Sequence, residues 1–203
     1  MPSTGARIYI FNHASMFDII LLFLLPENVK IMVKESYTEI PLLGTIIKKN
    51  EHVILKSGVE TDEQNGTFDS AVKTLESGFP LVVFPEGTRS KDGNISRFKT
   101  GAFKIAYATQ AEIIPVVIDS WNIVRPGDGL IFRDTKLYSK VMDSYKYEDY
   151  KNINVNDFTK ELRKKMFIEL RNLREIRVKK EKKYYRKTDF FIKLDKKAYD
   201  KVL

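Results

Sequence analysis

Cysteine is absent from the chain of 203 residues, and histidine occurs only twice. Without cysteine there is no disulfide framework, no thiolate nucleophile and no cysteine-ligated metal site, and the chain suits a reducing compartment. A Gly-x-Ser-x-Gly sequence, which presents the nucleophilic serine of many hydrolases on a sharp turn, is absent as well. We therefore expect no cysteine or elbow-serine nucleophile. No bound metal and no resident cofactor are expected either.

Long hydrophobic runs are also lacking. The longest uninterrupted apolar stretch covers residues 19–25, far fewer than the roughly 20 residues that a membrane-spanning helix needs. No signal-peptide pattern is present, so any contact with a membrane is expected from one side only. Gly/Ser-rich linkers and internal repeats are absent too, and with 43% apolar residues the chain is expected to build a single core.

The net charge of +8 is distributed unevenly along the chain. Residues 177–203 hold eleven Lys and Arg against four Asp and Glu, a net charge of +7, which leaves +1 for the rest of the chain. The basic character therefore belongs to this C-terminal segment. Aromatic residues are interleaved with the basic ones there, at positions 184, 185, 190, 191 and 199.

Short apolar runs alternate with helical patterns along the first 120 residues. Each run is rich in β-branched or aromatic residues, as expected of a buried strand. Strands that alternate with helices predict an α/β fold with a mostly parallel central sheet flanked by helices. The expected strands are residues 8–11, 29–33, 52–56, 80–84 and 113–118, with edge strands at 130–132 and 137–141, and the expected helices are residues 17–25, 67–77 and 100–110.

A long helix is predicted after residue 150. Asn156 is its expected N-cap, and apolar residues follow at steps of three or four. These residues are Phe158, Leu162, Met166, Leu170, Leu173 and Ile176. We expect residues 1–150 to form the main domain and residues 151–203 to form a C-terminal helix with a basic helical extension that packs on this domain or extends from it. Segment 40–47, rich in apolar residues, is expected to be either core or exposed apolar surface.

The sequence Asn-His-Ala-Ser-Met-Phe-Asp (residues 12–18) directly follows the first expected strand. Imidazole titrates near neutral pH, so His13 at a strand end is suited to take a proton from an alcohol. An acceptor must hold its other ring nitrogen, and Asp18 is the candidate if His13 lies on the turn and Asp18 just inside a helix capped by Ser15. The alternative is a polar turn without a catalytic role. His52 has no acidic partner at a useful spacing and is expected to be structural.

A second polar stretch, Phe-Pro-Glu-Gly-Thr-Arg-Ser (residues 84–90), follows the expected strand 80–84. Proline ends the strand and glycine permits an unusual backbone angle, so Glu86 and Arg89 are displayed at the edge of the sheet. Arginine presents a rigid fork to phosphate, and free backbone N–H groups beside Gly87 suit an anion. The alternative is a β-turn with a surface ion pair.

Together these two stretches resemble the first and third sequence blocks of the glycerolipid acyltransferases, a family that includes the bacterial 1-acylglycerol-3-phosphate acyltransferases. They occur in the family's order, about seventy residues apart. Phe-Lys-Thr-Gly-Ala (residues 98–102) resembles the sequence that follows the third block, and Ile-Ile-Pro-Val-Val (residues 113–117) resembles the proline-centred fourth block. The resemblance covers residues 8–118, and it implies that residues 1–150 are an acyltransferase domain.

The resemblance implies acyl transfer from a thioester, carried by coenzyme A or by acyl carrier protein, to the free hydroxyl of a lysophospholipid. The expected acceptor is 1-acylglycerol 3-phosphate and the expected product is phosphatidic acid. Glycerol 3-phosphate or another lysolipid is the alternative acceptor. Direct transfer from a thioester to an alcohol needs a base but no covalent nucleophile, which agrees with the missing cysteine and elbow serine.

Residue roles follow from the same resemblance. His13 is expected to act as the general base, and Asp18 to orient it. The expected substrate-binding residues are Lys34, Lys56, Glu86, Gly87, Thr88 and Arg89. Arg89 would be the principal phosphate ligand, and Glu86 would orient Arg89 or a glycerol hydroxyl. Lys56 stands where the second block usually ends in arginine, so it keeps the charge but not the bidentate fork.

Because the expected acceptor is a lipid, we expect peripheral binding to the cytoplasmic side of a membrane that contains anionic lipid. Residues 177–203 would be the anchor, with segments 17–25 and 40–47 as contributors, although a solvated helix extension is the alternative for this segment. Many family members carry hydrophobic helices before the first block, so this chain is expected to be a short member or part of a longer protein. The rival classes are a non-catalytic lipid-binding relative and a nucleic-acid-binding protein. No nucleic-acid partner is expected, because the basic residues lie away from the motifs.

Overall fold

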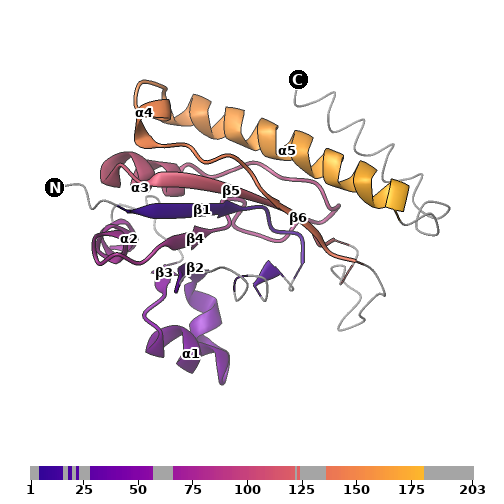
Figure 1. Cartoon of the computed structure of the whole chain (residues 1–203). Helices are drawn as coiled ribbons and strands as arrows, with labels where there is room; N and C mark the ends of the chain where they lie inside the picture. Colours follow the sequence, from indigo (N-terminus) through magenta and orange to yellow (C-terminus); the bar gives the residue numbers. More distant parts are fainter. Residues whose placement is uncertain are drawn as a thin grey trace.

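The computed structural model describes residues 5–15, 18–19, 22, 28–56, 66–121, 123 and 136–180. Six strands form one sheet in the order β3-β2-β4-β1-β5-β6 (Figure 1). All neighbouring strands are parallel except β6, which pairs antiparallel with β5 at one edge. The strands are β1 (Arg7–Phe11), β2 (Lys30–Lys34), β3 (Val53–Leu55), β4 (Leu81–Val83), β5 (Glu112–Asp119) and β6 (Tyr138–Val141).

Side chains alternate across the sheet, as the two-residue period of a strand requires. In β1, Ile8 and Ile10 lie in the larger core cluster, whereas Tyr9 and Phe11 lie in a smaller cluster on the opposite face. The larger cluster also holds apolar side chains from three helices: α2 (Thr67–Glu76), α3 (Gly101–Thr109) and α5 (Val155–Lys180). These three helices therefore cover the same face of the sheet.

The long helix α5 lies along the sheet and begins near the short α4 (Tyr147–Tyr150), as Figure 1 shows. Its predicted apolar stripe is buried except at the end, where Ile176 is exposed and Arg177 is buried instead. The predicted N-cap was wrong by two residues. The side-chain oxygen of Asn154 accepts the backbone N–H of Asn156, which places the cap before Val155.

The predicted α/β fold with a mostly parallel sheet is confirmed, and every expected strand among the described residues is present within one residue of its predicted bounds. Most of the expected helix 17–25, the expected strand 130–132 and the segment after Lys180 lie outside the described residues. No helix in the described part of the chain is long and apolar enough to cross a membrane.

Three short helices were not predicted: α4, η3 (Glu35–Glu39) and α1 (Leu43–Lys49). The last two form a hairpin between β2 and β3 that contains segment 40–47. Of the two expectations for this segment, exposed apolar surface is the one observed, because Ile40, Leu42, Leu43 and Ile46 are exposed and only Ile47 is a buried apolar residue.

Candidate active site

The two polar stretches meet at one edge of the sheet. β1 and β4 are parallel neighbours, with Ile10 level with Val83, so the residues that follow them emerge side by side. The backbone joins them directly, because the N–H of Ser90 donates to the carbonyl oxygen of His13 at 2.7 Å. Residues 12–15 and Asp18 therefore lie beside residues 84–90 at one edge of the sheet.

His13 and Asp18 form the predicted pair. The Nδ1 atom of His13 lies 2.8 Å from Oδ2 of Asp18, and the His13 ring packs 4.5 Å from the ring of Phe84, centroid to centroid. A proton on Nδ1 that is donated to this carboxylate leaves Nε2 as the atom available to a substrate. The side chain of His13 is 13% exposed, whereas that of Asp18 is fully buried.

Asp18 also organises the turn around it. Its Oδ2 accepts the backbone N–H groups of Ala14 and Ser15 at 2.7 and 2.8 Å, and its Oδ1 accepts the hydroxyl of Ser120. The backbone N–H of Asp18 donates in turn to the carbonyl oxygen of Ser15 at 3.3 Å. Ser120 was not among the predicted site residues, because it follows β5 and lies 102 positions away in the sequence.

Asn12 fixes the start of this turn on the neighbouring strand. Its side-chain amide donates to the carbonyl oxygen of Ile118 and accepts the N–H of the same residue, both at 2.8 Å. These two side-chain hydrogen bonds to Ile118 replace the backbone hydrogen bonds that would continue the pairing of β1 with β5. The side chain of Asn12 therefore sets the point at which the chain leaves the sheet and presents His13.

Glu86 connects the two stretches through its buried carboxylate. One oxygen accepts the backbone N–H of His13 at 2.8 Å, and the other accepts the N–H and the hydroxyl of Ser96 at 2.8 and 2.7 Å. Burial raises the pKa of Glu86, and these hydrogen bonds oppose that shift. The sequence assigned Glu86 to substrate binding, whereas its described bonds place it between the two loops, a role that the sequence did not indicate.

The loop that carries Ser96 is fixed in turn by α5. The Arg163 guanidinium donates to the carbonyl oxygens of Ser96 and Ile95 at 2.7 and 2.9 Å. Burial lowers the pKa of Arg163, and the nearby Glu86 carboxylate opposes this. α5 thus supports the Glu86 loop from the covered face of the sheet.

Gly87, Thr88 and Arg89 form the outer part of the second stretch. Gly87 has a φ of 70°, a conformation that suits glycine, and both Thr88 and Arg89 are exposed. The exposed Lys99 side chain lies over Gly87, with its Nζ 3.5 Å from the point that a Cβ of residue 87 would occupy. The backbone N–H of Lys99 donates to the carbonyl oxygen of Pro85 at 2.8 Å. Lys99 thereby adds a cation next to Gly87, two residues before Arg89, and the sequence did not indicate this role.

Lys34 and Lys56 stand at the same edge but farther along it. Lys34 ends β2, which lies two places from β1 in the sheet, and Lys56 follows β3, which lies three places away. With strands about 4.8 Å apart, these offsets from β1 are about 10 and 14 Å. Arg89 directly precedes Ser90, whose N–H bonds to His13, whereas Lys34 and Lys56 lie two and three strands away from β1.

His52 lies before β3, at the opposite end of that strand from Lys56. Its Nδ1 accepts the backbone N–H of Ile31 at 3.3 Å, which ties the start of β3 to β2. Burial, together with the positive charge of Lys30, lowers the pKa of His52. These contacts agree with the structural role predicted for it.

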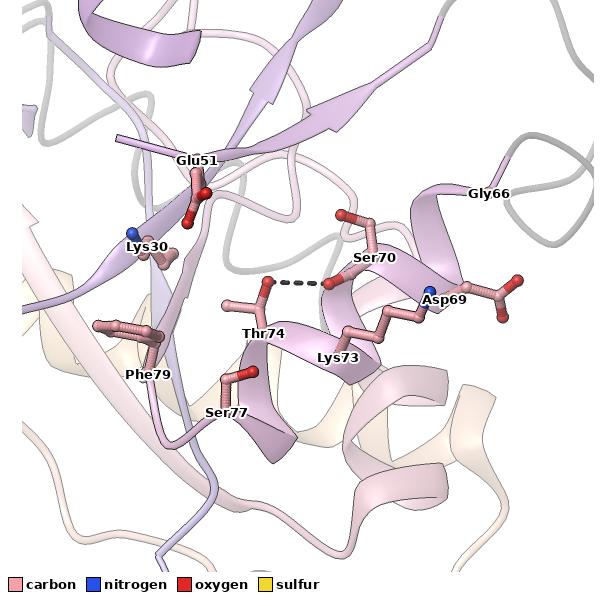
Figure 2. Close-up of a pocket in the computed structure, with 9 residues that line it drawn as sticks. All are labelled: Lys30, Glu51, Gly66, Asp69, Ser70, Lys73, Thr74, Ser77 and Phe79. Carbon is pink, nitrogen blue, oxygen red and sulfur yellow. Dashed lines mark hydrogen bonds between the residues drawn. The ribbon is translucent and has the colours of Figure 1, made fainter. Parts of the chain in front are cut away.

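A polar pocket of about 500 Å³ lies at the other end of β2 from Lys34. Figure 2 shows Lys30 and Phe79 on one side of it and polar side chains of α2 on the other. Lys30 is already engaged, since its Nζ donates to the carbonyl oxygen of Asn50 and lies 4.5 Å from the centre of the Phe79 ring. None of the predicted site residues lines this pocket. Within the described ranges, no cluster of three or more His, Cys, Asp or Glu could hold a metal ion.

A protein-family model described as Acyltransferase matches residues 1–119. The 1-acyl-sn-glycerol-3-phosphate acyltransferase of Haemophilus influenzae is 30% identical over 155 residues, which cover 74% of this chain and 62% of that protein. The protein of the same name from Cocos nucifera is 28% identical over 157 residues, with 77% and 51% covered. The chain spans about half the length of the latter relative, and as little as 35% of others.

A solved structure is also similar. The crystal structure of the 1-acyl-sn-glycerophosphate (LPA) acyltransferase PlsC from Thermotoga maritima superposes with a TM-score of 0.67 at 25% sequence identity. The superposition covers 86% of this chain and 68% of that one. The likeness therefore extends beyond residue 119, into the part of the chain that the family model does not match.

Proposed function

Because this chain belongs to the acyltransferase family, whose model matches more than half of its residues, we propose that it transfers a fatty acyl group from an acyl thioester to the free hydroxyl of a lysophospholipid. The proposed acceptor is 1-acylglycerol 3-phosphate, after the printed names of the relatives, and the product is phosphatidic acid. The observation that supports this most strongly is the His13–Asp18 pair at the sheet edge that also carries Arg89.

In the proposed mechanism, Nε2 of His13 takes the proton of the acceptor hydroxyl as its oxygen attacks the thioester carbonyl. A carbon–oxygen bond forms, and the carbonyl oxygen gains negative charge in the tetrahedral intermediate. Collapse of this intermediate breaks the carbon–sulfur bond, and the leaving thiolate takes the proton from His13. Asp18 holds Nδ1, stabilises the imidazolium between the two steps and is not itself protonated.

The phosphate of the acceptor is proposed to bind between Arg89 and Lys99, with Lys34 as a third cation. Arginine offers two parallel N–H donors to phosphate, whereas lysine contributes a point charge. The distances along the edge of the sheet support this order, since Lys56 lies about 14 Å from β1, farther than the others. Lys56 would then contact a more distant part of a substrate.

The donor is proposed to be the thioester of coenzyme A or of acyl carrier protein. We also propose that the protein acts peripherally at the cytoplasmic face of a membrane with anionic lipid, because the proposed acceptor is an amphiphile that resides in bilayers. No metal or resident cofactor takes part in the proposed steps, since the base and the cations are side chains of this chain.

The proposal is tested by incubating the purified full chain with radiolabelled acyl-coenzyme A, and separately with acyl carrier protein, and by separating the lipid products by chromatography. The acceptors are 1-acylglycerol 3-phosphate, glycerol 3-phosphate, a lysophospholipid with a choline headgroup, and monoacylglycerol. Labelled phosphatidic acid from the first acceptor, with monoacylglycerol poorly used, is the expected result. A labelled product from a different acceptor would show that the acceptor is that compound. The absence of any labelled product, with every combination of donor and acceptor, would contradict acyl transfer.

A further inference from the structure

Exposed apolar side chains gather on the hairpin formed by η3 and α1. Among the described residues, ten large apolar side chains are at least 36% exposed, and half of them lie within ten consecutive positions. These five, which we call the apolar hairpin, are Tyr37, Ile40, Leu42, Leu43 and Ile46. The other five are spread over the rest of the described chain. Clustered apolar exposure indicates a surface that contacts something other than water.

The backbone of the hairpin presents its most exposed side chain in a strained conformation. Leu42, 79% exposed, has φ 69° and ψ −55°, and the N–H of Leu43 donates to the carbonyl oxygen of Pro41 at 2.8 Å. This is the rare γ-turn, which is unfavourable for a residue with a side chain. A strained backbone that displays leucine to solvent has no benefit for folding, so it suggests a use for the exposed side chain.

The hairpin is also held in one shape. A Cβ on Gly44 would lie 2.0 Å from the carbonyl oxygen of Thr38, so only glycine lets α1 approach η3 this closely. On the inner side of α1, Ile47 is 4% exposed. The apolar hairpin is therefore a fixed projection from the sheet.

Position and charge indicate what this surface meets. η3 starts immediately after Lys34, at the edge of the sheet that carries His13. The exposed Lys48 and Lys49 lie in the last turn of α1. Apolar side chains flanked by lysines are typical of elements that insert into the interfacial region of a bilayer with anionic headgroups.

We propose that the apolar hairpin is the surface by which this protein docks on an anionic phospholipid bilayer. Leu42 and Ile46 enter the acyl boundary, and Lys48 and Lys49 contact lipid phosphates. Docking in this way brings the edge of the sheet at Lys34 to the headgroups. The proposal deepens the proposed function, since it names the surface through which a lipid acceptor would be reached, but vesicle binding does not require turnover.

The test measures flotation of the full chain with vesicles of phosphatidylglycerol and phosphatidylcholine, and with phosphatidylcholine alone. The hairpin variant combines Leu42→Asn with Ile46→Gln. The matched control combines Val141→Thr with Ile176→Gln, which also removes two exposed apolar side chains, 61% and 41% exposed, away from the hairpin. We expect the hairpin variant to lose at least tenfold in partitioning to the anionic vesicles, and the control to lose less than twofold. Circular dichroism establishes that both variants are folded.

Equal partitioning of the hairpin variant and the control would overturn the proposal. So would loss of flotation only in a chain shortened after Lys180, which would assign docking to the basic segment. A wild-type dimer that becomes a monomer in the hairpin variant, with unchanged flotation, would assign the surface to a second copy of the chain. Turnover of a short-chain acceptor below its critical micelle concentration is expected to be the same in the hairpin variant and the wild type. If neither shows turnover while the flotation difference persists, the proposed function fails and the docking surface stands.

Discussion

Two buried carboxylates hold His13, one by its ring and one by its backbone. Asp18 accepts the Nδ1 side of the imidazole, and Glu86 accepts the backbone N–H. The first contact follows from the spacing of residues within one turn, so the sequence predicts it. The second joins residues 73 positions apart and depends on the register of β1 against β4, which no local pattern specifies. The sequence therefore identifies His13 as the reactive group, whereas only the fold shows that Glu86 helps to position it.

Glu86→Gln separates a positioning role from a substrate-binding role. The amide keeps one acceptor oxygen, but its NH2 group would face a backbone N–H of either His13 or Ser96, and that N–H would lose its acceptor. The free energy of unfolding is therefore expected to fall by about 1–3 kcal/mol. Loss of the constraint on His13 is expected to lower kcat, with little change in KM for the acceptor. Urea unfolding and steady-state kinetics measure both. A raised acceptor KM with unchanged stability would instead support the contact with substrate that the sequence predicts.

Arg89→Lys and Lys99→Met test the proposed phosphate site. Each is expected to raise the KM for 1-acylglycerol 3-phosphate by about tenfold, the weight of one charge-assisted hydrogen bond. The KM for monoacylglycerol, which has no phosphate, should change less than twofold. Lys91→Met is the control, because Lys91 is exposed in the same loop but lies beyond the second stretch. If both acceptors weakened equally, these side chains would not recognise phosphate.

The pairing of β2 with β3 depends on a neutral histidine. His52 accepts a backbone N–H that a protonated imidazole could not accept through the same nitrogen. Its pKa is lowered in the folded state by burial and by Lys30. The unfolded chain, with an ordinary histidine pKa of about 6.5, therefore binds more protons below that pH. Folding stability from this group is complete above pH 6.5 and declines as the pH falls towards the folded pKa.

His52→Gln is expected to reduce this pH dependence. Between pH 7 and pH 5, the free energy of unfolding of the wild type should fall further than that of the variant, as measured by urea unfolding across the range. The raised pKa of Glu86 acts in the opposite direction, but it is present in both proteins and cancels in the difference. Parallel stability curves would show that the imidazole is not buried in its neutral form.

α5 is tied to the site by two arginines, Arg177 and Arg174. Arg177, counted in the basic segment, is 2% exposed, and its Nη1 lies 2.5 Å from Oδ2 of the buried Asp119. Arg174 contacts the other oxygen of Asp119 at 3.3 Å and also donates to the carbonyl oxygen of Gly93 at 2.5 Å. Asp119 immediately precedes Ser120, which contacts Asp18. The end of α5 therefore supports the strand that completes the site.

Arg177→Met is expected to lower the free energy of unfolding by about 3 kcal/mol, because it leaves one oxygen of a buried carboxylate without its cation. Lys179→Met, two positions on and exposed, is expected to change it by less than about 0.5 kcal/mol. Urea denaturation measures both. Equal effects in the two variants would mean that the Arg177–Asp119 pair does not stabilise the fold. A truncation that tests the basic segment should therefore begin after Lys180.

For the whole molecule, the sequence predicts the sheet well because its strands are short buried runs, each with a strong local pattern. Parallel connections then force the carboxyl ends of β1 and β4 to one edge, so the meeting of residues 12–18 with residues 84–90 was also predictable. The apolar hairpin was harder to predict, since its residues suit core and surface equally. Whether these side chains face the core or the solvent depends on the close approach of α1 to η3 at Gly44. Ser120 and Arg177 could not be predicted, because their partners come from strand register and helix docking.

The positions of the charged residues in the fold differ from what their distribution along the sequence indicates. The sequence places a net +7 in residues 177–203, yet Arg177 is buried against Asp119. Lys34, Arg89 and Lys99, by contrast, belong to a part of the chain with almost no net charge and gather at one edge of the sheet. A local set of cations, rather than the overall charge, is what the proposed acceptor phosphate would meet.

His13→Ala tests whether His13 is the base of the proposed acyl transfer. Production of labelled phosphatidic acid from acyl thioester and 1-acylglycerol 3-phosphate is measured for this variant, for the wild type and for His52→Gln. We expect kcat to fall by a factor of about 10² to 10⁴ in His13→Ala, the usual contribution of a positioned general base. The His52→Gln variant is expected to react at a rate within about twofold of the wild type. A His13→Ala rate within a few-fold of the wild type, in a variant that unfolds at an unchanged urea midpoint, would contradict the role of His13 as the base.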